Sequence, residues 1–108
     1  SEALKRRCLY LYLDYPSPER EREIILRRVP GIGSELADQV VRVVAALRRL
    51  DLKKAPSISE TLDWARTLIL LGLHEVDAKT ALATLNILLK YRSDIERATK
   101  SFTAAGLP

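Results

Sequence analysis

The sequence predicts an all-α fold, a small helical bundle of four to five helices preceded by one short β-strand. Leu, Ala, Arg, Lys and Glu dominate the composition, and only four Gly and five Pro interrupt 108 residues. Capping residues precede several stretches in which apolar side chains recur at helical spacing. With 47% hydrophobic and 30% charged residues, the chain has the balance of a folded domain with one small core.

The predicted strand covers residues 8–15. Leu9, Leu11 and Leu13 alternate with Cys8, Tyr10 and Tyr12, so both faces of an extended segment would be apolar or amphipathic. A lone strand satisfies none of its ladder hydrogen bonds. We therefore expect its sheet partners to lie elsewhere, and the chain, which begins with a serine, to be part of a longer protein.

The first two helices have clear start signals. Ser17 is a suitable N-cap and Pro18 suits the first helical position of a helix that reaches about residue 28, before Pro30. We expect Ser34 to cap a second helix that runs to about Leu50. Its apolar stripe comprises Leu36, Val40, Val43, Val44 and Leu47.

Capping boxes mark the later helices. Ser57 and Glu60 predict the start of a third helix, which Gly72 would end. A fourth helix is expected from Asp77. Ser93 and Glu96 form a second possible capping box, so either a short fifth helix spans about 94–105 or the fourth helix continues through it.

The residues offer little for catalysis by this chain alone. The sequence contains no phosphate-binding loop of the GxxxxGK[ST] type, no GxGxxG and no Ser/His/Asp set. One Cys and one His, His74, cannot build a zinc site here, and His74 is expected at the surface. Trp64 is expected to pack in the core.

Charge and hydropathy limit where in the cell the protein is expected and which kinds of partner it could bind. The net charge of +4 permits an anionic partner, but basic and acidic residues alternate as on an ordinary solvated surface. No stretch reaches the roughly 18 apolar residues of a membrane span. One cysteine in 108 residues suits a reducing compartment, so we expect a soluble, cytoplasmic protein without a membrane partner.

One local motif indicates DNA binding. Val29-Pro-Gly-Ile-Gly-Ser-Glu-Leu-Ala resembles the core of a helix-hairpin-helix, which binds duplex backbone without reading bases. In that motif the backbone N–H groups around Gly31, Ile32 and Gly33 would hold a phosphate. The same residues also suit any tight turn between helices, and Glu35 and Asp38 would repel a phosphate. Non-specific binding of duplex DNA therefore stays an alternative, and nucleic acid is not our expected partner.

A longer resemblance covers almost the whole chain. It is carried by residues 1–16 (SEALKRRCLYLYLDYP), 56–66 (PSISETLDWAR) and 88–95 (LLKYRSDI). These segments resemble the C-terminal third of a MoxR-like AAA+ ATPase, of the branch associated with carbon monoxide dehydrogenase maturation. The resemblance implies that residues 1–16 end the ATPase core, with its arginine finger and last strand, and that residues 17–108 form the helical lid.

The resemblance also implies roles for individual residues. Arg7 falls at the position of the arginine finger, with Arg6 as the alternative. An arginine finger stabilises the charge of phosphoryl transfer in the neighbouring subunit. The lid's sensor 2 arginine falls at Ser59, so this chain departs from the family there. Arg66, seven residues further along the same helix face, could approach the nucleotide instead.

For the complete protein the resemblance implies an ATPase that uses ATP and Mg²⁺. Its subunits would associate in a ring, by the family pattern a hexamer. It would act as a chaperone in assembling or activating enzymes or metal cofactors, and the resemblance implies a partner that carries a von Willebrand factor A-type domain. The 108 residues themselves would bind no cofactor and would not hydrolyse ATP.

Overall fold

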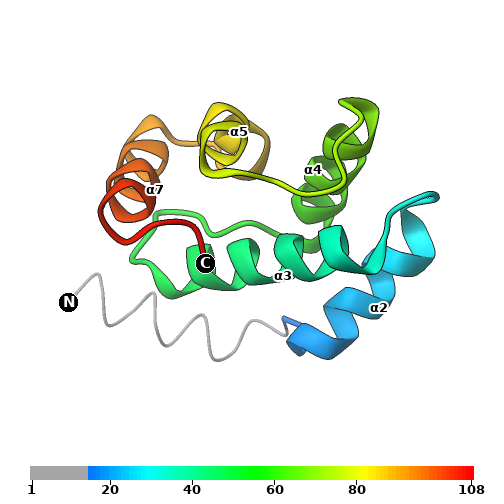
Figure 1. Cartoon of the computed structure of the whole chain (residues 1–108). Helices are drawn as coiled ribbons and strands as arrows, with labels where there is room; N and C mark the ends of the chain where they lie inside the picture. Colours follow the sequence, from blue (N-terminus) through cyan, green and yellow to red (C-terminus); the bar gives the residue numbers. More distant parts are fainter. Residues whose placement is uncertain (1–14) are drawn as a thin grey trace.

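The computed structural model describes residues 15–108, and the fold of this part is a compact all-α globule (Figure 1). Within that range there are six helices and no strand. They are α2 (Pro18–Arg28), α3 (Ser34–Arg49), α4 (Ile58–Leu70), α5 (Ala78–Ala83), α6 (Leu85–Leu88) and α7 (Arg92–Ala105). The predicted strand, residues 8–15, lies outside the described residues except for Tyr15, which is in no strand.

The starts of α2 and α3 follow local chemistry. As predicted, Ser17 caps α2, because its side chain accepts a hydrogen bond from the backbone N–H of Arg20. The predicted cap of α3 was wrong by one residue. Gly33 is the N-cap, with an extended backbone at φ −81°, and Ser34 is already helical, so α3 begins without a side-chain cap.

Helix α4 has the predicted capping box and the predicted end. Ser57 accepts from the backbone N–H of Glu60, and the Glu60 carboxylate accepts from the backbone N–H of Ser57 at 2.9 Å. At the other end Gly72 has φ +76°, and the N–H of Leu73 bonds the carbonyl of Leu68. This is the Schellman arrangement, in which glycine takes the left-handed position without strain.

The predicted fourth helix is interrupted. Asp77 caps it as expected, but the backbone leaves helical geometry at Thr84, which separates α5 from the single turn α6. The Thr84 hydroxyl donates to the carbonyl of Thr80 and accepts from Trp64 Nε1 at 2.8 Å. Since Trp64 comes from α4, a tertiary contact holds the residue at which the helix breaks.

The last helix starts two residues earlier than predicted, and its predicted capping box is absent. Tyr91 is the N-cap of α7 and provides no side-chain hydrogen bond, and Ser93 is inside the helix. The buried carboxylate of Asp94 instead accepts from the backbone N–H groups of Lys53 and Lys54, at 2.8 and 3.1 Å. The first turn of α7 is therefore tied to the α3–α4 connection.

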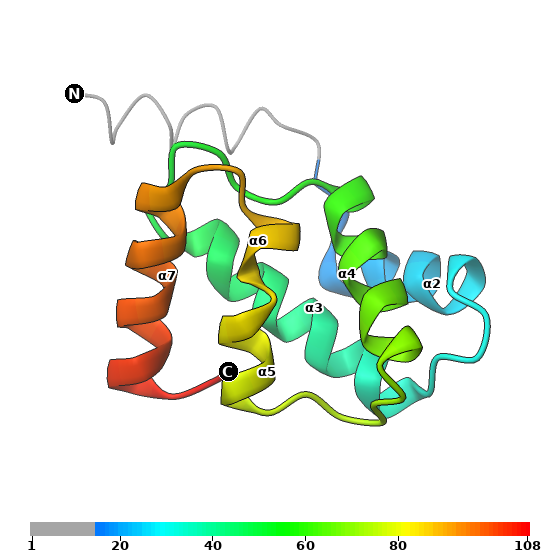
Figure 2. The same ribbon diagram turned by 90° about the horizontal axis from the view of Figure 1, so that it is seen from above.

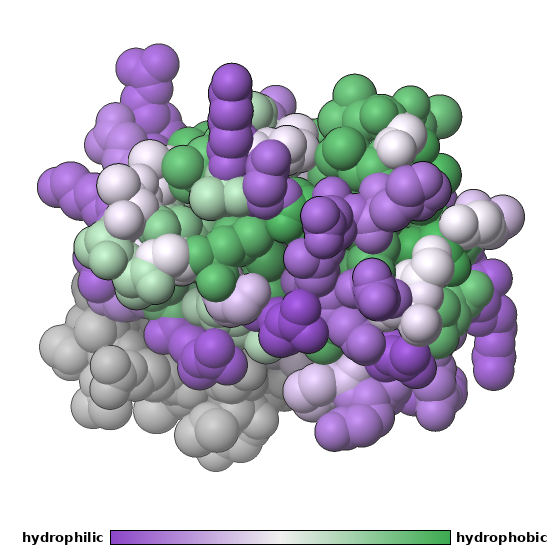
Figure 3. Space-filling model, in the orientation of Figure 1, coloured by the Kyte–Doolittle hydropathy of each residue, from purple (hydrophilic) through white to green (hydrophobic). Residues whose placement is uncertain are grey.

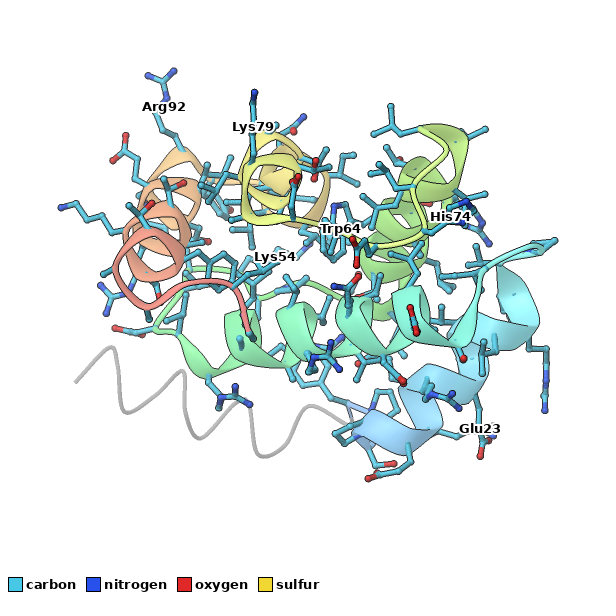
Figure 4. The ribbon with its side chains drawn as sticks, in the orientation of Figure 1. Glu23, Lys54, Trp64, His74, Lys79 and Arg92 are labelled. Carbon is cyan, nitrogen blue, oxygen red and sulfur yellow. The ribbon has the colours of Figure 1, made fainter. Side chains whose placement is uncertain are left out.

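Helix α3 is the central element. Helix α2 packs along one side of it, and α4 to α7 lie on the other (Figures 1 and 2). The predicted apolar stripe of α3 is buried, as is Trp64, which Figure 4 shows in the interior between the helices. Core residues from the other elements include Ile25, Leu68, Leu85, Leu88 and Phe102. The core thus needs residues from every helix.

Candidate functional site

The structure places the predicted site residues in separate regions. Arg6 and Arg7 lie outside the described residues. Ser59 and Arg66 are exposed on α4, and Gly31 to Gly33 form the turn between α2 and α3. That turn lies near Ile69, close to the C-terminal end of α4. Ten residues separate Ser59 from Ile69, about 15 Å along a helix, so Ser59 lies at the opposite end of α4 from the turn, whereas Arg66 lies three residues before Ile69.

One of these ends adjoins the point where the described chain begins. Arg48, near the end of α3, is buried there and contacts three residues outside its own helix. Its Nη1 and Nη2 atoms donate to the two carboxylate oxygens of Glu21 at 2.8 and 2.9 Å. Its Nε donates to the carbonyl of Pro56 at 3.1 Å, and its guanidinium lies 4.2 Å from the ring centroid of Tyr15. We refer to these four residues as the N-terminal junction.

The N-terminal junction contains a buried, bidentate ion pair between Arg48 and Glu21. Side chains of Glu21 and Arg48 are only 2% and 4% exposed, and the bidentate pair matches guanidinium to carboxylate geometry. Among the described residues, no buried side-chain nitrogen or oxygen lacks a hydrogen-bond partner. A buried ion pair adds little net stability by itself, but losing one partner leaves an uncompensated buried charge. The pair therefore fixes α2 against the end of α3.

The first turn of α4 extends directly from the N-terminal junction. Pro56, which accepts from Arg48, immediately precedes the capping box at Ser57 and Glu60. The box directs the helix so that Ser59 is exposed at its start. Arg66 lies two turns further along, where it forms an exposed ion pair with Asp63 at 3.4 Å. Such a pair is weak enough for an anionic ligand to displace.

The α2–α3 turn forms the second candidate site. Gly31 has φ +85°, a conformation that glycine adopts without strain, and Gly33 leaves α3 uncapped by any side chain. Beside the turn is a surface depression of about 310 Å³. Its lining residues are Gly31, Gly33, Ser34, Glu35, Leu36, Ile69, Leu73 and His74.

The charges near this turn are mixed. Glu35 lines the depression, and Asp38, which the sequence placed towards a phosphate, is paired with Arg22 of α2. His74 is exposed, as predicted, on the side of the molecule that carries the turn (Figure 4).

An adjoining depression is lined by three carboxylates, those of Glu35, Glu75 and Asp77. The backbone N–H of Thr80 donates to Asp77 and holds the pKa of that carboxyl below its usual value.

Two further properties of the described residues bear on function. Within residues 15–108, no group of three or more His, Cys, Asp or Glu side chains is placed to hold a metal ion. No helix in that range is long and apolar enough to cross a membrane. Figure 3 shows an apolar area over the end of α4, where Leu70 and Leu71 are 86% and 58% exposed.

Comparison with models of protein families, with curated proteins and with solved structures found no match to this chain.

Sequence reasoning missed the N-terminal junction, although the pattern contains a signal for it. Arg48 continues the i+4 series of Leu36, Val40 and Val44 on the buried face of α3. Glu21 stands four residues before the buried Ile25 on α2. A basic and an acidic residue at core positions of two neighbouring helices predict a buried pair, because neither charge is stable there alone.

Proposed function

We propose that this chain is the helical lid, together with the end of the preceding core, of a MoxR-like AAA+ ATPase. The complete protein would hydrolyse ATP with Mg²⁺ as a ring, by the family pattern a hexamer, in the cytoplasm. It would act as a chaperone that assembles or activates an enzyme or a metal cofactor. A protein with a von Willebrand factor A-type domain is the proposed partner.

The observation that carries this proposal is the position of Ser59. By the resemblance, the sensor 2 residue opens the third helix of the lid, and α4 is the third helix of the described chain. Here Ser59 is exposed in the first turn of α4, three residues after Pro56, which Arg48 links to Tyr15. Figure 2 shows this turn beside the start of the described chain. This arrangement supports the lid interpretation of segment 56–66.

The departure at Ser59 limits what the lid would contribute. Serine carries no charge and cannot neutralise a γ-phosphate as arginine does. Arg66 is on the same face, two helical turns away, and among residues 15–108 its ion pair is with the exposed carboxylate of Asp63. We propose that Arg66 is the lid cation closest to the nucleotide and that catalysis depends mainly on the arginine finger.

The test of this proposal is ATP turnover by the complete protein and by this chain alone. The 108 residues should show no turnover, because they contain no phosphate-binding loop. In the complete protein, Arg7→Ala should lower the rate by about 100-fold or more, since one charge-stabilising donor contributes on that scale. Arg6→Ala is the matched control and should lower it much less, with ring assembly retained in both. If both variants turn over ATP at the parental rate, the arginine-finger assignment is wrong.

The second candidate is non-specific binding of duplex DNA through the α2–α3 turn. It is favoured by the uncapped start of α3 and by the open space around Gly33, where an added Cβ would meet no atom within 4 Å. It is opposed by Glu35 beside the same turn.

Fluorescence anisotropy with a short duplex separates the two candidates. The exposed cations beside the turn, Arg27 and Arg28, allow only a few phosphate contacts, so we expect weak binding that falls steeply with salt. Gly33 has an ordinary backbone conformation, so Gly33→Val should fold while blocking close approach of a phosphate. Sub-micromolar binding at physiological salt that Gly33→Val abolishes would replace the ATPase proposal with the DNA-binding one.

A further inference from the structure

Arg48 differs from every other arginine of the described chain in how many segments it joins. It contacts Tyr15 before the first described helix, Glu21 in α2 and Pro56 before α4, and it belongs to α3 itself. The other arginine ion pairs of residues 15–108, at Arg20, Arg22 and Arg66, each join one carboxylate to one guanidinium and are substantially exposed. Only at Arg48 do four separate parts of residues 15–108 meet on one planar group.

The geometry makes these contacts interdependent. Both Nη atoms are held by Glu21, so the plane of the guanidinium is fixed relative to α2 and α3. The third donor direction, Nε, is used by Pro56, and the ring of Tyr15 lies close to the same group. A displacement of Tyr15 therefore acts on the same buried group that binds the carbonyl of Pro56, the residue before the α4 capping box. Burial strengthens this dependence, since water cannot replace a contact that is lost.

The chain offers a contrast on a neighbouring surface. Lys53 Nζ lies 5.6 Å from the ring centroid of Tyr91, but both residues are exposed and Lys53 makes no side-chain ion pair with any described residue. A flexible, solvated ammonium group couples only weakly to the position of a neighbouring ring.

We propose that Arg48 is a positioning residue that clamps the chain at Tyr15 to the first turn of α4, so that the two move together. The clamp itself involves only residues 15–60 and stands independently of the ATPase. Under the proposed function, it would couple reorientation at the start of the lid to the position of Ser59 at the nucleotide, and that part rests on the proposed function.

The experiment measures backbone amide chemical shifts of the 108-residue chain by NMR in four variants. Tyr15→Leu removes the aromatic contact but leaves the Glu21–Arg48 pair. Tyr91→Leu is the matched control, because it removes the other contact between a cation and a tyrosine ring. Arg48→Lys retains the charge but loses the bidentate fork, and the double variant of Tyr15→Leu with Arg48→Lys completes the cycle.

We expect Tyr15→Leu to shift the amides of Ser57, Ile58 and Ser59 clearly more than Tyr91→Leu does. In the Arg48→Lys background, Tyr15→Leu should no longer shift them.

The proposal is overturned if the shifts stay within residues 15–17, or if they are the same in both backgrounds. If Arg48→Lys does not fold, the comparison of Tyr15→Leu with Tyr91→Leu decides the question. No result here depends on ATP hydrolysis, so failure of the clamp is distinct from failure of the ATPase proposal.

Discussion

At the scale of single residues, the buried pair of Glu21 and Arg48 is the most consequential contact described. Arg48→Met preserves much of the side-chain volume but leaves the carboxylate of Glu21 buried without its cation. Removing one partner of such a pair costs about 3–5 kcal/mol. We expect the free energy of unfolding, measured by urea denaturation, to fall by that amount.

The neighbouring arginine provides the control for this change. Arg49 is exposed on the same helix and belongs to none of the described ion pairs. Arg49→Met should change the free energy of unfolding by less than about 0.5 kcal/mol. Equal effects of the two substitutions would show that the pair does not stabilise the fold.

Residue-scale prediction from sequence succeeded where the residue type alone decides the environment. Trp64 was expected in the core and is fully buried, and His74 was expected at the surface and is exposed. Arg48 was not foreseen, because arginine is almost always solvated and only its register on α3 marks it as buried.

At the scale of elements, capping chemistry distinguishes α4 from α7. Ser57 has the reciprocal hydrogen bonds of a capping box, whereas Ser93, predicted to have the same role, lies inside α7 without capping it. Ser57→Ala should therefore lower the free energy of unfolding by about 1 kcal/mol.

Ser93→Ala tests the difference directly. Because Ser93 is exposed within a helix, its replacement by alanine should be neutral or slightly stabilising. Both free energies come from urea or thermal unfolding of the same chain. A loss at Ser93 as large as the loss at Ser57 would contradict the assigned start of α7.

Helix boundaries were predictable wherever neighbouring residues determine them. The start of α2, the capping box of α4 and the N-cap at Asp77 depend on residues three positions apart, so the sequence reveals them. The break at Thr84 depends on Trp64, twenty residues away, and the start of α7 on the contact of Asp94 with Lys53 and Lys54. Periodicity within one helix carries no information about such partners.

At the scale of the whole molecule, the helical bundle was predictable from composition and apolar spacing, whereas the function depends on the resemblance. Arg6, Arg7 and most of the predicted strand lie outside the described residues, so these assignments remain predictions. Ser59 and Arg66 were placed on the face of one helix by their spacing, and both are exposed on α4. What spacing did not reveal is that α4 begins beside Tyr15, because that neighbourhood depends on Arg48.

We propose that the first turn of α4 faces the nucleotide in the complete protein. The most direct measurement places a photoreactive benzophenone amino acid at position 59 and irradiates the protein with radiolabelled ATP and Mg²⁺. The same amino acid at position 93, an exposed serine in the first turn of α7, is the matched control.

Benzophenone reacts only with groups in its immediate vicinity, so covalent labelling reports proximity. Our prediction is labelling of the variant at position 59, loss of that label with excess unlabelled ATP, and no specific labelling at position 93. Equal labelling at the two positions, or none at position 59 in a protein that hydrolyses ATP, would contradict it.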